Sequence, residues 1–68
     1  MKFKNCEVGI RVELKRDCVN NDGEYYKGMV GTIDNIYSER EFACDTVKVL
    51  FDDGSKGYFS PEELRRFR

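Results

Sequence analysis

The chain has 68 residues, of which 40% are hydrophobic, and this is enough for one small domain, residues 1–68, with a single core. Charged residues make up 37% of the chain but leave a formal net charge of only −1, which excludes the excess of cations typical of strong nucleic-acid binders. No apolar stretch approaches the ~20 residues of a membrane span, and the first residues lack the apolar core of a secretory signal, so we expect a cytoplasmic protein.

The first half of the chain predicts two strands separated by a long polar loop. Residues 10–15 alternate aliphatic and charged side chains, which is the period of a strand with one face in a core. Residues 16–27 predict a loop around an Asn-Asn-Asp-Gly turn signature. A second strand is expected from about Tyr26 to Tyr37, in which Gly28 and Gly31 predict a bend or a bulge.

The second half predicts two further strands around a tight turn. Residues 46–51 alternate so that Val47, Val49 and Phe51 face the core. Asp53-Gly54 is a strong hairpin signal, because glycine accepts the positive φ that tight turns require. A fourth strand is then expected over residues 55–59.

A single helical turn is predicted before the last strand. Ser60 suits the N-cap, Pro61 suits the first helical position, and Glu63 completes a capping box. The last strand is expected over residues 65–68, with Leu64 and Phe67 both returning to the core. Five short strands with one helical turn before the last favour an all-β barrel.

Cys6, Cys18 and Cys44 cannot all pair with one another. Their spacing fits no metal site, and the chain has no histidine, so we expect no metal and no cofactor. We interpret all three as reduced thiols that are buried or half-buried, with a disulfide or a metal shared with a carboxylate as the alternative.

Four segments resemble the SH3-like barrels, especially their Tudor and KOW-type branches. Residues 22–30 (DGEYYKGMV), 47–55 (VKVLFDDGS) and 64–67 (LRRF) resemble the Tudor second strand, third strand with its acidic turn, and ending. Residues 28–36 (GMVGTIDNI) instead resemble a KOW-like segment. The resemblance implies a five-stranded SH3-like (Tudor/KOW-like) barrel with a single helical turn before the last strand, and it leaves the function open.

The chain departs from two known binding modes of such barrels. It has no tryptophan and only one proline, which argues against recognition of proline-rich peptides. A Tudor methyl-lysine cage needs three or four aromatic walls, and the resemblance offers Tyr25, Tyr26, Phe51 and Tyr58 with Asp53 as an anion. However, Tyr26 and Phe51 are expected in the core.

Catalysis is not expected. The chain lacks histidine, so neither a cysteine nor a serine has an obvious base. The carboxylate pairs Asp52-Asp53 and Glu62-Glu63 occupy turn and cap positions, which explains them without chemistry. We therefore expect a binding protein rather than an enzyme, and we name no catalytic residue.

Our first hypothesis is a protein-binding surface made of tyrosines beside acidic residues. Four tyrosines cannot all fit inside so small a barrel, and tyrosine is favoured at interfaces. Acidic residues near the first loop and the Asp-Gly turn would suit a basic or methylated peptide. The short chain suggests a small accessory or inhibitor protein, from a phage or mobile element, that docks onto a larger machine as a monomer or weak homodimer. The residues expected to bind are Tyr25, Tyr26, Tyr37, Asp53 and Tyr58.

Our second hypothesis is nucleic-acid binding through a basic strip, as the KOW resemblance implies. Cations follow phosphates while aromatic rings stack on bases. Against this, 13 acidic residues balance 12 basic ones, as on an ordinary solvated surface. The termini of such barrels often lie close together, which would gather the terminal cations. The residues expected to bind are Lys48, Lys56, Arg65, Arg66 and Arg68.

Overall fold

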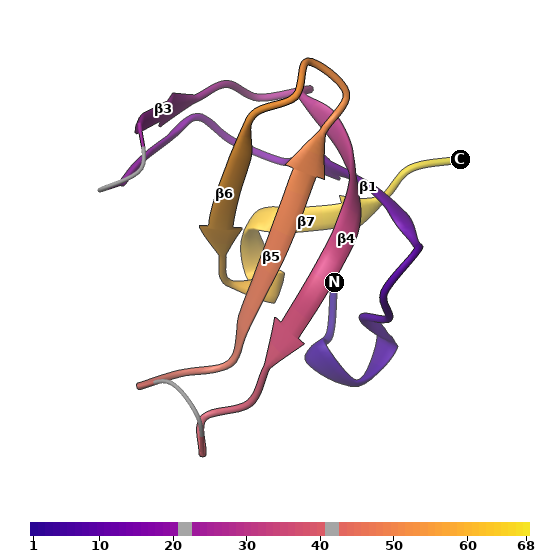
Figure 1. Cartoon of the computed structure of the whole chain (residues 1–68), viewed down its shortest axis with the longest axis vertical. Helices are drawn as coiled ribbons and strands as arrows, with labels where there is room; N and C mark the ends of the chain where they lie inside the picture. Colours follow the sequence, from indigo (N-terminus) through magenta and orange to yellow (C-terminus); the bar gives the residue numbers. More distant parts are fainter. Residues whose placement is uncertain (21–22, 41–42) are drawn as a thin grey trace.

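The computed structural model describes residues 1–20, 23–40 and 43–68, which form antiparallel β-structure with two short 3₁₀ turns (Figure 1). No helix among these residues is long and apolar enough to cross a membrane. In chain order the elements are η1 (Phe3–Asn5), β1 (Arg11–Leu14), β2 (Cys18–Asn20), β3 (Gly23–Tyr25), β4 (Val30–Tyr37), β5 (Thr46–Phe51), β6 (Lys56–Phe59), η2 (Pro61–Glu63) and β7 (Leu64–Arg66).

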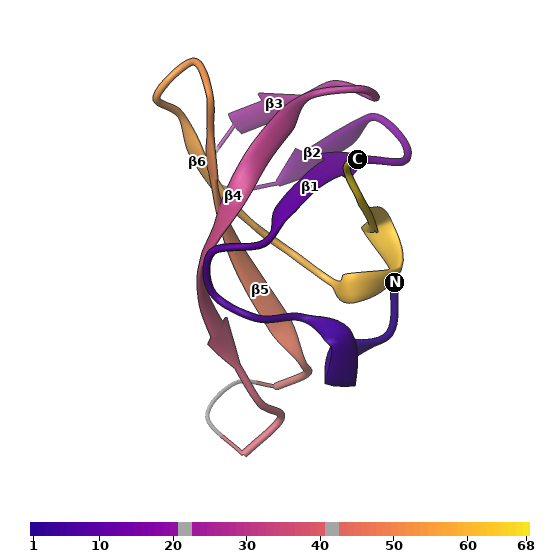
Figure 2. The same ribbon diagram turned by 90° about the vertical axis from the view of Figure 1, so that its right-hand side faces the viewer.

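The strands form one five-stranded sheet in the order β6-β5-β4-β1-β7 and a separate hairpin, β2-β3. Figure 2 shows β4 and β5 on one side of the molecule, with η2 and the N-terminal turn on the other. The expectation of a mainly antiparallel β-fold with one helical turn before the last strand is confirmed. Closure of a barrel is not: among the described residues, β6 and β7 each pair with one neighbour only.

The core lies between these two sides. The burial of alternate residues on β5 confirms the alternation that the sequence predicted. Val47 and Val49 are fully buried, and Phe51 is 3% exposed. The expectation for Phe67 is wrong, because its side chain is 42% exposed while Leu64 is fully buried. Successive strand residues point to opposite faces, so two residues separated by three positions cannot both face the core.

The predicted loop over residues 16–27 is wrong in part, because it contains the paired strands β2 and β3. Residues 21–22 of the predicted turn signature lie outside the described residues. Cys18 lies opposite Tyr25 in this hairpin, and both are buried. The expected second strand also starts too early. Tyr26 accepts a backbone hydrogen bond from Met29 at 3.1 Å, and Gly28 has φ of 91°, so a turn precedes β4.

The pairing of β3 with β2 exchanges the roles that the sequence predicted for two tyrosines. Tyr25 is 4% exposed and Tyr26 is 58% exposed, the reverse of what the sequence predicted. A change of one residue in strand register moves every side chain to the other face. The predicted bend is present at Gly28, although it lies before β4. The irregularity within β4 lies between Ile33 and Asn35, where the register against β5 shifts, rather than at Gly31.

The predicted capping box is present at the start of η2. The Glu63 carboxylate accepts hydrogen bonds from the Ser60 backbone N–H at 3.0 Å and from the Ser60 hydroxyl at 3.2 Å. The Cys18 thiol also donates to Glu63, with 2.9 Å between Sγ and Oε2. Burial, together with the nearby Glu63 carboxylate, raises the pKa of Cys18 to about 11, so the thiol is protonated at neutral pH. Glu63 thus joins β2 to η2.

The Cys18 contact also gives Glu63 a role in pH-dependent stability. Burial acts to raise the pKa of Glu63, but the hydrogen bonds from Cys18 and Ser60 outweigh it and hold that pKa below its ordinary value. Such a carboxyl stabilises the fold above its unfolded pKa, and this stability is lost as pH falls through its folded pKa.

We expect the wild-type protein to be more stable than a Glu63→Gln variant near neutral pH by about 1 kcal/mol, which is the ordinary worth of a helix cap. The difference should begin to shrink as pH falls below the ordinary glutamate pKa of about 4.3, and it should vanish once pH has fallen through the lower pKa of the folded carboxyl. Urea denaturation of both proteins at several pH values measures this difference. A difference that stays constant on acidification would contradict the assigned role.

The cysteines follow the sequence-based interpretation at two of three positions. Cys6 and Cys18 are buried free thiols, as predicted. Cys44 is free but exposed, so the expectation that it is buried or half-buried is wrong. Cys44 lies in the segment before β5, where the chain has not yet entered the core.

Candidate functional site

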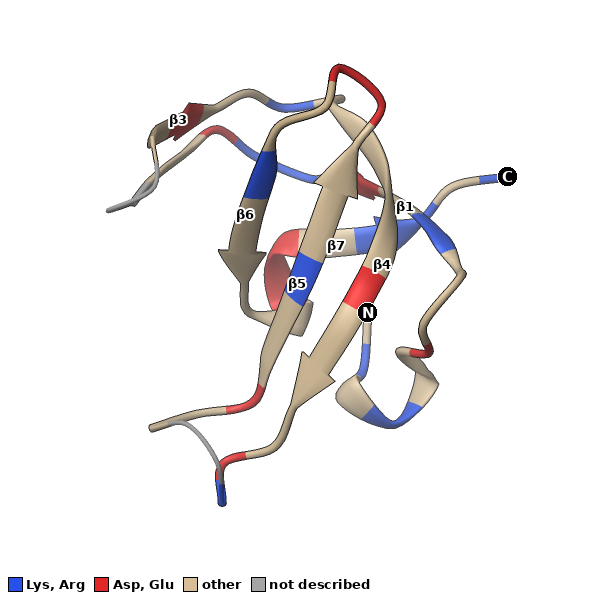
Figure 3. Cartoon of the chain, in the orientation of Figure 1, with Lys and Arg blue, Asp and Glu red and all other residues tan. Residues whose placement is uncertain are grey.

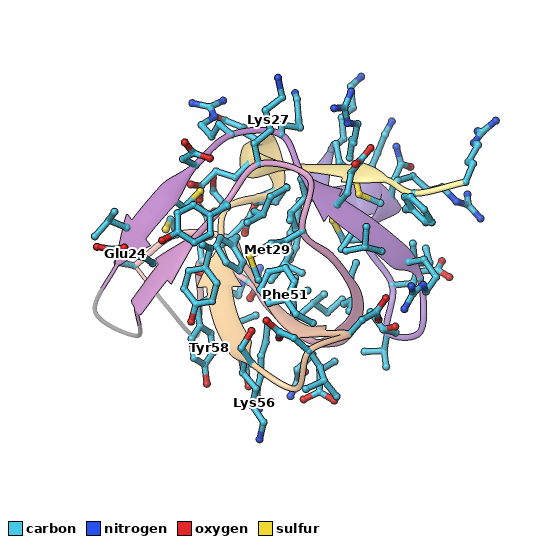
Figure 4. The ribbon with its side chains drawn as sticks, turned by 90° about the horizontal axis from the view of Figure 1, so that it is seen from above. Glu24, Lys27, Met29, Phe51, Lys56 and Tyr58 are labelled. Carbon is cyan, nitrogen blue, oxygen red and sulfur yellow. The ribbon has the colours of Figure 1, made fainter. Side chains whose placement is uncertain are left out.

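A groove of about 420 Å³ lies between the β2-β3 hairpin and the turn that joins β5 to β6. It brings together aromatic, acidic and sulfur-containing side chains from segments about 30 residues apart. Figure 4 shows this end of the molecule from above, with Glu24 and Met29 of the groove labelled. The groove, hereafter the acidic groove, is lined by Gly23, Glu24, Tyr25, Tyr26, Met29, Asp53 and Ser55.

Tyr25 forms a fixed part of the groove wall. Its ring stacks on Phe51 with 5.5 Å between centroids and meets Phe59 edge-on at 5.1 Å. Its hydroxyl donates a hydrogen bond to the Lys56 backbone carbonyl. Tyr25 therefore belongs to the core, and the prediction that it is an exposed binding residue is wrong, although one part of it borders the groove.

Tyr26 is the exposed ring of the groove. Its hydroxyl donates to a Glu24 carboxylate oxygen at 3.1 Å, and this contact raises the pKa of Tyr26 above its ordinary value. Its backbone N–H contacts the Met29 sulfur at 3.2 Å. The turn that ends the hairpin thus places a ring, a thioether and a carboxylate side by side.

Asp53 supplies the second carboxylate from the opposite side of the groove. One of its oxygens accepts hydrogen bonds from the Ser55 N–H at 2.8 Å and the Ser55 hydroxyl at 2.6 Å. These bonds lower the pKa of Asp53, so it is ionised at neutral pH. The predicted Asp-Gly turn therefore presents a charge as well as reversing the chain.

The neighbouring carboxylate, Asp52, has a different environment. Arg11 donates to both Asp52 oxygens at 2.7 Å each, which lowers the Asp52 pKa and neutralises its charge locally. Within the described part of the chain, neither Glu24 nor Asp53 forms a salt bridge with a lysine or arginine. The acidic groove therefore has negative charge that no described cation offsets.

The other predicted protein-binding residues lie elsewhere. Tyr37 on β4 and Tyr58 on β6 approach each other, with 6.3 Å between ring centroids, and neither lines the acidic groove. The sequence placed them with Asp53 because all five residues are near loops, but the pairing of β4, β5 and β6 sends them to the sheet. Of the five residues, only Tyr25, Tyr26 and Asp53 are brought together.

The described residues do not assemble the methyl-lysine cage, which the sequence already disfavoured because Tyr26 and Phe51 were expected in the core. Phe51 is a core residue, Tyr25 is almost entirely buried, and Tyr58 does not line the groove. Tyr26 is therefore the one well-exposed ring among the four candidates that borders it. Met29, which the sequence reasoning missed as a groove residue, takes the place of another wall. The signal for it was Gly28, whose positive φ makes the turn that places Met29 beside Tyr26.

The predicted basic strip is divided into two groups. Lys48 and Lys56 lie on β5 and β6, at one end of the strand order, whereas Arg65 and Arg66 lie on β7 at the other end. Lys48 forms a salt bridge with Asp34 at 3.3 Å. These cations therefore lie on strands that are not adjacent in the sheet order.

The terminal cations are nevertheless gathered, as the sequence predicted. The Met1 nitrogen donates to the Leu64 carbonyl at 3.1 Å, which brings the two end segments together. Between them lies a hollow of about 570 Å³. This hollow, hereafter the terminal hollow, is lined by Met1, Lys4, Asn5, Glu7, Ile10, Arg65, Arg66 and Arg68.

No family model, curated protein or solved structure matches this chain.

Proposed function

We propose that this chain is a non-catalytic protein-binding module whose acidic groove accepts a basic side chain, lysine or arginine, of a partner. The observation that carries the proposal is the position of Glu24 and Asp53, which are not paired with a described cation, beside the exposed ring of Tyr26. A cation in this position gains from both carboxylates and from the ring face.

The shape of the acidic groove supports a side chain with a long apolar stem. Met29 and the Tyr26 ring offer apolar surface, and Glu24 and Asp53 line the same groove. Lysine and arginine bury their methylene stems while keeping the charge in a polar setting. With a single exposed ring, the groove suits an unmodified cation better than a trimethylated one, for which several rings would be needed.

We further propose that the fold is an SH3-like barrel of the Tudor/KOW type, in which this groove lies between two loops at one end. The five-stranded antiparallel order and the single turn before the last strand support that assignment. A cytoplasmic accessory or inhibitor protein that docks onto a larger protein machine is the role we propose for such a module, because the groove is small and contains no catalytic constellation that we recognise.

A Tyr26→Ala variant should bind a short lysine- and glycine-containing peptide roughly tenfold more weakly than the wild type, as expected for an interface residue worth over 1 kcal/mol. Glu24→Gln should weaken binding by a smaller factor, because one of the two carboxylates remains. NMR titration measures both affinities and reports whether the resonances of Tyr26, Met29 and Asp53 shift.

Two matched controls make this test specific. Tyr58→Ala removes a partly exposed ring outside the groove, and Glu62→Gln removes one negative charge outside it, so both should bind as the wild type does. Equal loss in controls and groove variants would contradict the proposal. Binding of a single-stranded oligonucleotide in place of the peptide, with steep weakening by salt, would favour the nucleic-acid alternative.

A further inference from the structure

We infer that the terminal hollow is a second docking site, and that its occupant is an acidic peptide segment of a partner protein. The site shares no lining residue with the acidic groove. Figure 3 shows acidic residues in β3 and the β5-β6 turn, and basic residues in the N-terminal segment, in β7 and at the C-terminus. The near-zero net charge therefore includes a local group of acidic residues around the acidic groove and a local group of basic residues around the terminal hollow.

The cations of the terminal hollow are largely available. Arg65 is engaged, because its Nε lies 2.9 Å from a Glu13 carboxylate oxygen. No salt bridge among the described residues involves Lys4, Arg66 or Arg68, and all three side chains are exposed. One carboxylate, Glu7, belongs to the lining, so three unpaired cations outnumber it.

The lining also offers apolar contact. Ile10 and Met1 are half-buried and pack against the core, so they form a fixed surface rather than a mobile one. Phe67 lies between Arg66 and Arg68 in sequence and is 42% exposed. Arginine, methionine and aromatic residues are the types enriched at protein interfaces.

The mixture of groups favours a peptide over a nucleic acid. A phosphodiester backbone offers only hydrogen-bond acceptors, so Glu7 would repel it. A peptide backbone also carries N–H donors, which Glu7 and the Asn5 amide oxygen can accept. A long polyanion would, in addition, meet the acidic residues elsewhere on a chain with a net charge of −1. A short acidic segment with one apolar side chain can direct a backbone N–H toward Glu7 and its carboxylates toward the arginines.

The test uses a capped Asp-Glu-Leu-Asp-Glu peptide and, in parallel, a single-stranded oligonucleotide of the same charge. We expect the peptide to shift the NMR resonances of Lys4, Ile10 and Arg66. An Arg66→Gln/Arg68→Gln variant should bind it at least tenfold more weakly. Arg40→Gln, which removes an exposed arginine outside the hollow, should bind it normally.

Three results would overturn the inference: no binding of the peptide, equal loss in the Arg40→Gln control, or tighter binding of the oligonucleotide at the same site. Tyr26→Ala separates this site from the acidic groove, since that variant should keep its full affinity for the acidic peptide. The two docking proposals can therefore fail independently.

Discussion

A Phe51→Ala variant should lose about 3–5 kcal/mol of unfolding free energy, the usual cost of truncating a buried phenylalanine. Phe51 is almost completely buried, stacks on Tyr25 and meets Phe59 edge-on with 5.7 Å between centroids. Truncation removes the shared partner of both other rings and leaves a cavity that this sheet cannot close. Small domains have about 5–15 kcal/mol of stability, so the loss would leave little.

Thermal and urea denaturation followed by circular dichroism measure the effect of Phe51→Ala. Tyr58→Ala is the matched control, because it removes a large ring from a strand of the same sheet while exposing little new core. Its ring is 39% exposed, so we expect it to cost about 1 kcal/mol or less. Similar unfolding of Phe51→Ala and wild type would mean that β5 does not present Phe51 to the core.

The experiment also bears on the acidic groove, because Phe51 supports the Tyr25 ring from behind. If the variant stays folded, for example in a stabilising buffer, we expect the groove to lose its wall and the lysine peptide to bind more weakly. Tyr25→Ala should also weaken binding of the lysine peptide. We expect this because the variant is less stable, rather than because a direct contact with the peptide is lost. Tyr26→Ala should instead weaken binding with little change in stability, which distinguishes the exposed tyrosine from the buried one.

The elements that the sequence predicts well are those whose signals are local. β5 has the predicted bounds because its alternation is regular and the Asp-Gly turn limits it on one side. The turn η2 follows from Ser60, Pro61 and Glu63, three adjacent signals that agree. In η2 the hydrogen-bond partners lie within a few residues, and β5 pairs with β4 and β6, the strands that precede and follow it in the chain.

The elements that the sequence mispredicts depend on register. Tyr25 and Tyr26 are adjacent and chemically identical, so only the pairing of Cys18 with Tyr25 decides which ring is buried. Neither β2 nor β3 exceeds three residues, which is too short for a clear alternation. The prediction that Phe67 is buried is wrong for a related reason, because the hydrophobicity of a residue does not show which face of a strand it occupies.

The sequence shows which kinds of residue form the candidate sites, but it does not show which of those residues lie together. Acidic residues with tyrosines, and arginines near the C-terminus, are visible in the sequence and are brought together in the acidic groove and the terminal hollow. Which of them share a site depends on the sheet order, which places β5 and β7 apart. The turn at Gly28 places Met29 in the acidic groove, and the packing of the two chain ends places Glu7 in the terminal hollow. The sequence offers only weak signals for either placement.

Gly31→Ala should destabilise the protein by about 3 kcal/mol, at the upper end of the range for overpacked cores. Gly31 lies on β4 between Val12 of β1 and Phe51 of β5. A Cβ atom there would lie 2.5 Å from the Leu50 carbonyl oxygen and 2.8 Å from the Phe51 Cα. These are backbone atoms, so the clash cannot be relieved by a change of rotamer, and β4 would have to move away from β5.

The sign of the change makes this test decisive. At a strand position with room for a methyl group, replacing glycine by alanine stabilises a protein by about 0.4–1 kcal/mol, because it restricts the unfolded chain. Thr32→Ala, at the next position of β4, is the control and should cost less than about 1 kcal/mol, since its side chain is half-exposed. Urea denaturation compares the two variants. A stabilised Gly31→Ala protein would mean that β4 and β5 do not approach as closely as their register requires, and that the wall of the acidic groove, which Phe51 supports, is not rigid.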